Sequence, residues 1–146
     1  MEERSTPLTV LLADPDERMR SELRRILEDD EGEPRFLVIG EQTEGLVEGA
    51  ERLRPDLIIL DPYNDRGPGF EVIDQLYRRI PEVRRVIVTR NSERHDLIDL
   101  LQMRVHAYLL GDTEIDLDML LATLRLVGRT GAACFDPRVI EDDTSS

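Results

Sequence analysis

The stretch "LIILDPYNDRGPGFE", residues 57–71, decides the fold. Its four leading apolar residues predict a short strand that is buried on both faces, as strands of a parallel sheet are. The run ends at Asp61, and Pro62 opens a loop rich in Asp, Asn, Gly and Pro, residue types that favour turns. A buried strand that delivers a carboxylate into a loop raises the question of what that carboxylate does.

The same alternation of a short apolar run and an amphipathic stretch continues along the chain. Strands are predicted over residues 8–13, 35–42, 56–60, 85–89 and 107–110, and helices over residues 15–29, 44–54, 70–80, 92–103 and 113–129. Ser92 and Thr113 are the expected N-caps of the last two helices. Five strand–helix units predict an α/β fold with a doubly wound, five-stranded parallel sheet and helices on both faces.

Length and composition limit the classes of protein. The 146 residues suit one domain, expected over residues 1–130 with a tail or linker over 131–146. No apolar run approaches the roughly 20 residues of a membrane span, and the start does not resemble a signal peptide. The single cysteine, Cys134, is expected to be a small buried hydrophobe, and the chain is expected to be cytoplasmic. The net charge of −13 argues against direct contact with nucleic acid.

Polar residues stand where several predicted strands end. Asp14 and Asp16 follow the first strand, Asp61 follows the third, and Thr89 ends the fourth. Because ligands of open α/β sheets bind at the carboxyl ends of the strands, these side chains are expected to converge there. Carboxylates that converge are usually explained by a hard divalent cation. All 19 basic residues are arginine, so no mechanism in this chain can use a lysine ammonium.

These positions resemble the receiver domain of bacterial two-component response regulators, and the resemblance covers residues 8–130. It implies a flavodoxin-like (βα)5 fold, with an aspartate that accepts a phosphoryl group beside Mg²⁺. On this resemblance "LLADPDE" places Asp14 at the first metal-binding acid, and "LIILDPYNDRGPGFE" places Asp61 at the phosphoacceptor. "VIVTR" and "HAYLLGD" place Thr89 at the switch hydroxyl and Tyr108 at the switch aromatic.

Two positions depart from the family pattern. Pro15 falls where the second metal-binding acid is expected, and Gly111 falls where the family has a lysine. Asp16 is the nearest substitute for the acid, Asp65 is a weaker one, and Arg90 is the nearest substitute for the lysine charge. The resemblance therefore implies a degenerate site in which Mg²⁺ binding is weak or absent. Phosphorylation of Asp61 is expected to be weak or unnecessary for signalling.

Structural roles compete with functional ones at each position. Asp61 also suits a turn cap, and Asp14 also suits the N-cap of the first helix with Pro15 at its first position. Asp16 also suits a first-turn acid that the helix dipole stabilises. Thr89 and Tyr108 also suit plain strand packing. The two histidines, His95 and His106, lack neighbouring ligands that would make a metal site.

The C-terminal part of the chain carries a weaker resemblance. "LLATLRLVGRTGAACFDPRVI", residues 120–140, is similar to the end of receivers that lead into a helix-turn-helix DNA-binding domain. This implies transcription regulation and a histidine kinase as partner. The apolar density of "IDLDMLLATLRLV", residues 115–127, exceeds what one core face requires and predicts a homodimer surface.

Three alternatives remain open. The first is a functional receiver in which phosphorylated Asp61 controls a DNA-binding output. The second is a haloacid-dehalogenase-like phosphatase, because Asp14 and Asp16 follow a hydrophobic strand as an Asp-x-Asp pair; the missing second acidic pair counts against it, and the chain is expected not to be an enzyme. The third is a flavodoxin-like interaction module without a site; the loop after Asp61 lacks the Ser/Thr/Gly-rich pattern of a flavin binder.

Overall fold

A six-stranded parallel sheet forms the centre of the protein. The computed structural model describes residues 6–63, 69–90, 105–110 and 116–135. The strand order is β2-β1-β3-β4-β5-β6, and every pairing of neighbours is parallel. The elements are β1 (Leu8–Leu12), α1 (Glu17–Asp29), β2 (Phe36–Glu41), α2 (Leu46–Leu53), β3 (Leu57–Leu60), α3 (Glu71–Arg79), β4 (Arg84–Thr89), β5 (Ala107–Leu110), α5 (Leu117–Thr130) and β6 (Cys134–Phe135).

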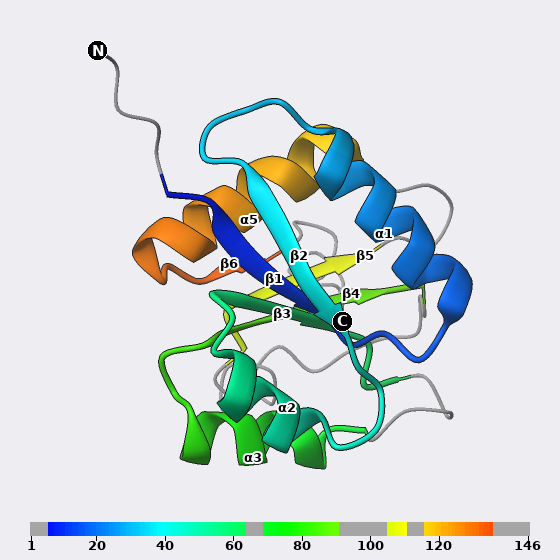
Figure 1. Ribbon diagram of the computed structural model, residues 1–146, viewed down its shortest axis with the longest axis vertical. Coiled ribbons are helices and arrows are strands. Elements are labelled where there is room, and N and C mark those ends of the chain that lie inside the picture. Colours follow the sequence, from blue (N-terminus) through cyan, green and yellow to red (C-terminus); the bar gives the residue numbers. More distant parts are fainter. Residues whose placement is uncertain (1–5, 64–68, 91–104, 111–115, 136–146) are drawn as a thin grey trace, which may run out of the picture.

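Helices cover both faces of this sheet. Figure 1 shows α1 and α5 on one face and α2 and α3 on the other. Successive residues of a strand point to opposite faces, so β3 supplies both cores. Leu57 and Ile59 pack towards α1 and α5, whereas Ile58 and Leu60 pack towards α2 and α3. Each of the four is at most 2% exposed, which stabilises the fold by about 2 kcal/mol per side chain. The predicted doubly wound sheet is confirmed.

The helix starts differ from the sequence prediction because the caps differ. α1 buries Met19, Leu23, Ile26 and Leu27, the apolar face that the spacing predicts. It begins at Glu17, since the Asp16 carboxylate accepts a hydrogen bond from Arg18 N and acts as the N-cap. α5 begins at Leu117 with Asp116 as its cap, not at Thr113.

The predicted helix 92–103, with Ser92 and His95, lies outside the described residues, as does Thr113 itself. Within the described ranges, no helix is both long and apolar enough to cross a bilayer.

The structure adds a sixth strand to the predicted five. α5 ends at Thr130 and is capped by Gly131, whose φ of +71° is a left-handed conformation that glycine adopts without strain. The chain then turns back, and Cys134 N donates to His106 O at 2.8 Å. Cys134 packs against the α1/α5 core but stays partly exposed, so the expectation of full burial is wrong. Phe135 packs against the α2/α3 core.

Arg84, Arg85 and His106 form a basic cluster at the amino-terminal ends of β4 and β5. The Arg85 side chain is 1% exposed, and its Nη1 donates to Val83 O at 2.6 Å. Its guanidinium also lies 5.4 Å from the centre of the Tyr77 ring. Arg85 N donates to His106 Nδ1 at 3.1 Å, so this ring nitrogen carries no proton. Burial, followed by the charges of Arg85 and Arg84, lowers the pKa of His106 from 6.5 to about 4.

This cluster predicts a stability loss at mildly acidic pH. The folded-state pKa of His106 lies below its unfolded value, so its contribution is present above pH 6.5 and is lost as pH falls towards 4. His106→Asn keeps an acceptor for Arg85 N and does not titrate. Across this interval the wild type is expected to lose about 2 to 3 kcal/mol more unfolding free energy than the variant. Urea unfolding at stepped pH measures the difference, and equal pH slopes for the two proteins would contradict the prediction.

Candidate functional site

The carboxyl ends of β1, β3 and β4 bring the predicted site residues to one edge. Leu12 pairs with Ile59, and Leu60 pairs with Ile87, which sets the register of the three strands. Asp14 follows the end of β1, Asp61 follows β3 directly, and Thr89 is the last residue of β4. The predicted convergence of these three residues is therefore observed. Gly111 and Asp65 lie outside the described residues.

Asp14 is a buried acid in surroundings that disfavour its charge. The residue is 1% exposed, and burial is the main cause that raises its pKa from 3.8 to about 6. The carboxylates of Asp61 and Asp16 raise it further, whereas the hydrogen bond from Asp16 N to Asp14 Oδ1, at 2.7 Å, lowers it. Arg20 also lowers it. The pKa of Asp14 stays raised after all these contributions, so Arg20 offsets the effects of burial and of the neighbouring carboxylates only in part.

Asp16 and Asp61 each use a carboxylate oxygen for local structure. Asp16 Oδ1 accepts from Arg18 N at 2.9 Å and caps α1, so the expectation that Asp14 is the N-cap is wrong. The Asp14 carboxylate instead accepts a hydrogen bond from the amide of Asp16, the residue just before the helix. Asp61 Oδ1 accepts from Tyr63 N at 3.0 Å, an Asx-type turn that begins the following loop. These bonds fix the direction of both carboxylates.

The donor set departs from what Mg²⁺ favours. Mg²⁺ demands near-octahedral oxygen ligands and usually takes at least one direct carboxylate. Pro15 contributes no side-chain oxygen at the position of the second acid. In the part of the chain that the structure describes, no three acidic, histidine or cysteine side chains form a group able to hold a metal ion. The described residues at this edge thus offer one carboxylate fewer than the resemblance implies, and weak or absent Mg²⁺ binding stays a prediction.

Thr89 and Tyr108 are both enclosed at this end of the sheet. Thr89 pairs with Leu110 across the β4–β5 ladder, and both Thr89 and Tyr108 are fully buried. The Tyr108 ring packs in the α2/α3 core, 6.1 Å from the Tyr63 ring centre and nearly perpendicular to it. Tyr108 thus points inward. The switch roles expected for the two residues stay predictions.

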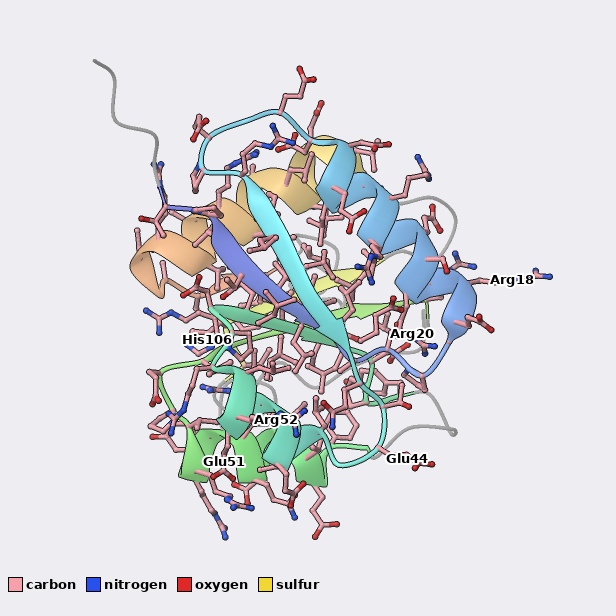
Figure 2. The ribbon with its side chains drawn as sticks, viewed as in Figure 1. Arg18, Arg20, Glu44, Glu51, Arg52 and His106 are labelled. Atoms are coloured by element: carbon pink, nitrogen blue, oxygen red, sulfur yellow. The ribbon has the colours of Figure 1, made fainter. Side chains whose placement is uncertain are left out.

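The arginines near the site lie on the α1 side. Arg90 Nη2 lies 3.2 Å from Glu22 Oε2 on α1, and about half of the Arg90 side chain is exposed. Arg20 is a site residue that the sequence analysis did not identify. Its Nη1 donates to Asp14 O at 2.7 Å, and its Nε pairs with Glu41 at 3.1 Å. Figure 2 shows Arg20 lying against the loop that joins β1 to α1, whereas Arg18 projects into solvent. Its position one turn after the cap is the signal that could identify it.

Comparison with known families identifies the class of protein. Residues 10–125 match the family model of the response regulator receiver domain. The match covers more than half of the chain, and the chain belongs to this family of signalling domains. The family resemblance implied by the sequence is therefore confirmed.

Two relatives identified by sequence are named a transcriptional regulatory protein and a response regulator. The chain is 28% identical over 127 residues to the transcriptional regulatory protein DegU of Brevibacillus brevis, which covers 86% of this chain and 52% of that protein. It is 31% identical over 110 residues to the nitrate/nitrite response regulator protein NarL of Escherichia coli, which covers 74% and 50%. The chain thus spans about half the length of the curated relatives it matches.

Solved structures support the fold. A LuxR-family two-component response regulator from Aurantimonas sp. SI85-9A1 superposes with a TM-score of 0.78 at 16% identity, over 94% of this chain and 96% of that one. The isolated REC domain of RcsB from Salmonella enterica serovar Typhimurium, in the presence of phosphomimetic BeF3-, gives a TM-score of 0.75 at 22% identity, over 94% and 99%. The flavodoxin-like α/β fold is confirmed.

The electrostatics of Asp14 predict a stabilising substitution. Its folded-state pKa is raised, so its neutral form stabilises the fold at low pH, and this stability is lost as pH rises through about 6. Asp14→Asn removes the charge and keeps an acceptor for Asp16 N. At pH 7.5 the variant is expected to gain up to about 3 kcal/mol of unfolding free energy, and at pH 4 almost none.

Chemical denaturation at the two pH values measures the gain, and Asp74→Asn is a matched control. Asp74 is a 53% exposed partner of Arg78, so its substitution is expected to change stability by less than about 0.5 kcal/mol at either pH. A gain for Asp14→Asn that does not depend on pH would contradict the prediction.

Proposed function

We propose that this chain is a regulatory receiver domain with a degenerate phosphoacceptor site. In this proposal Asp61 keeps the acceptor position, Mg²⁺ binds weakly or not at all, and the domain signals without phosphorylation or with weak phosphorylation. The domain acts as a signalling module and not as an enzyme. The observation that carries the proposal is Pro15, which stands beside the buried Asp14 where the family has its second acid.

Charge balance supports this proposal. A phosphoryl group on Asp61 would add negative charge beside Asp14, a carboxyl whose pKa is already raised. Positioned cations are the largest contribution to phosphoryl transfer in such sites. The second acid is missing at Pro15, the lysine is missing at Gly111, and Arg90 pairs with Glu22 on α1. We propose Arg20 as the cation nearest to the acidic pair, through its contact with the carbonyl of Asp14.

Beryllofluoride with Mg²⁺ tests the degenerate site. Amide NMR shifts of Thr89 and Tyr108 are expected to be the same with and without this phosphoryl analogue in the wild type. The double variant Pro15→Asp, Gly111→Lys restores the two missing charges. It is expected to show shifts at both residues, because a metal ligand and a cation then neutralise the analogue.

Asp61→Ala, introduced into the wild type and into the restored variant, is the control. It is expected to abolish the response of the restored variant. A response of the wild type that Asp61→Ala removes would overturn the degenerate site and leave the first alternative, a phosphorylated receiver. That alternative is supported by the position of Asp61 directly after β3, at the sheet edge where Asp14 follows β1.

The phosphatase alternative has less support. It requires Asp16 as a proton donor and acceptor, but one Asp16 oxygen caps α1, and the family match covers receivers.

The output proposed for the whole protein is control of transcription. DegU and NarL are named as a transcriptional regulatory protein and a response regulator, and this chain spans about half of each. We propose a cytoplasmic protein with a histidine kinase as partner. With a net charge of −13, the receiver itself is not expected to touch nucleic acid directly.

Homodimerisation through α5 completes the proposal. Related RcsB is described as dimers bound to DNA. In this chain α5 buries Leu120, Leu124 and Val127, while Leu126 stays 46% exposed on the flank that also carries Met119. This flank offers apolar area to a second copy of the chain.

Substitutions at two exposed leucines, Leu126 on α5 and Leu37 on β2, test the dimer. Leu126→Asp is expected to weaken self-association at least about tenfold, because it places a charge in the proposed contact. Leu37→Asp is the matched control, since Leu37 is 52% exposed but lies on β2. Sedimentation equilibrium over a concentration series measures both. Equal dissociation constants for the two variants, or a monomeric wild type, would contradict the α5 dimer.

A further inference from the structure

Aromatic side chains form a continuous row from the Asp61 loop to the last strand. The Tyr63 ring lies 4.7 Å from the Phe70 ring and 6.1 Å from the Tyr108 ring, edge to face in both cases. Tyr108 is the register partner of Phe135 in the β5–β6 ladder. Paired residues of a parallel ladder point to the same face, and both pack in the α2/α3 core. Four of the six aromatic residues of the chain therefore lie in this one row.

One end of the row is tied to the Asp61 carboxylate. Tyr63 N donates to Asp61 Oδ1 at 3.0 Å, so the backbone that carries the Tyr63 ring takes its position from that oxygen. Any change in the carboxylate, whether a bound cation, a covalent group or a partner's side chain, alters this hydrogen bond. The Tyr63 ring is only partly buried, which leaves it room to respond.

The other end of the row is a strand of marginal length. β6 has two residues, and its described backbone contact outside the ladder is the bond from Cys134 N to His106 O at 2.8 Å. Elements with so few contacts open at low free-energy cost. Burial of the Phe135 side chain against the α2/α3 core adds the apolar contact that holds β6 in place. Because Tyr108 and Phe135 are register partners on this face, a shift of Tyr108 would change the apolar surroundings of Phe135 and hence the pairing of β6.

We propose that Tyr63, Tyr108 and Phe135 form an aromatic relay that couples the state of the Asp61 carboxylate to the pairing of β6 with β5. The relay reports on Asp61 at β6, the last strand among the described residues. It requires neither Mg²⁺ nor phosphate. It builds on the position of Asp61 in a receiver and is independent of whether the site is degenerate.

Amide hydrogen exchange at Cys134 tests the relay in the forward direction. Asp61→Ala and Tyr63→Ala are expected to speed this exchange at least about tenfold relative to wild type. Tyr63→Phe keeps the ring and is expected to match wild type. The amide of Gly131, bonded to Val127 O at the end of α5, and that of Ala13, bonded to Ile59 O in the core, are internal controls. They are expected to keep their rates, which separates opening of β6 from general destabilisation.

Fluorotyrosine labelling tests the relay in the reverse direction. The chain has three tyrosines, so fluorine NMR gives one signal each for Tyr63, Tyr77 and Tyr108. Phe135→Ala is expected to shift the Tyr108 and Tyr63 signals and to leave that of Tyr77, which lies on α3 and contacts Arg85 of β4. Cys134→Ala is the matched control, because Cys134 packs on the opposite face of the sheet.

Two results would overturn the relay. One is Cys134 exchange that stays at the wild-type rate in both Asp61→Ala and Tyr63→Ala. The other is a Tyr63 signal that does not respond to Phe135→Ala. Neither result bears on the degenerate site, which the beryllofluoride experiment tests separately.

Discussion

Two parallel ladders, from β3 to β1 and from β3 to β4, set the position of every group at the candidate site. They align the strand ends so that Asp14, Asp61 and Thr89 leave the sheet at the same edge. Burial of β3 on both faces keeps this alignment rigid, since each of its four side chains is at most 2% exposed. The sheet therefore sets where these residues lie, and hydrogen bonds in the loops set the direction of each carboxylate.

The electrostatics of that edge distinguish this chain from what the family resemblance implies. A receiver that neutralises its acids with a metal and a lysine can hold several carboxylates in the charged state. Here burial raises the pKa of Asp14 to about 6, and Arg20, which binds the Asp14 carbonyl, also pairs with Glu41. Backbone amides from Asp16, Arg18 and Tyr63 stabilise the three carboxylates instead. Among the described residues, local backbone amides therefore contribute to holding all three carboxylates at this edge.

The regular elements could be predicted from the sequence because apolar spacing reports burial directly. Leu57 to Leu60 and the buried face of α1 are examples, and the place of Asp61 after β3 follows from them. The cap of α1 could not be predicted, because Asp14 and Asp16 both suit an N-cap and only backbone angles decide between them. β6 is too short to carry a pattern, and its pairing depends on the turn at Gly131. The contact of Arg20 with Asp14 O follows from the position of Arg20 one turn after the cap, so it could be predicted only once Asp16 was known to be that cap.

β6 also protects the fold from other chains. An uncovered β5 would present a row of backbone N–H and C=O groups, the kind of open edge on which other polypeptides add strands. The residues that match the family model end at 125, before the last turn of α5 and before both residues of β6. A domain cut at that limit would keep every candidate site residue that the structure describes, yet it would expose β5 and favour aggregation. β6 therefore contributes to resistance against aggregation as well as to the fold.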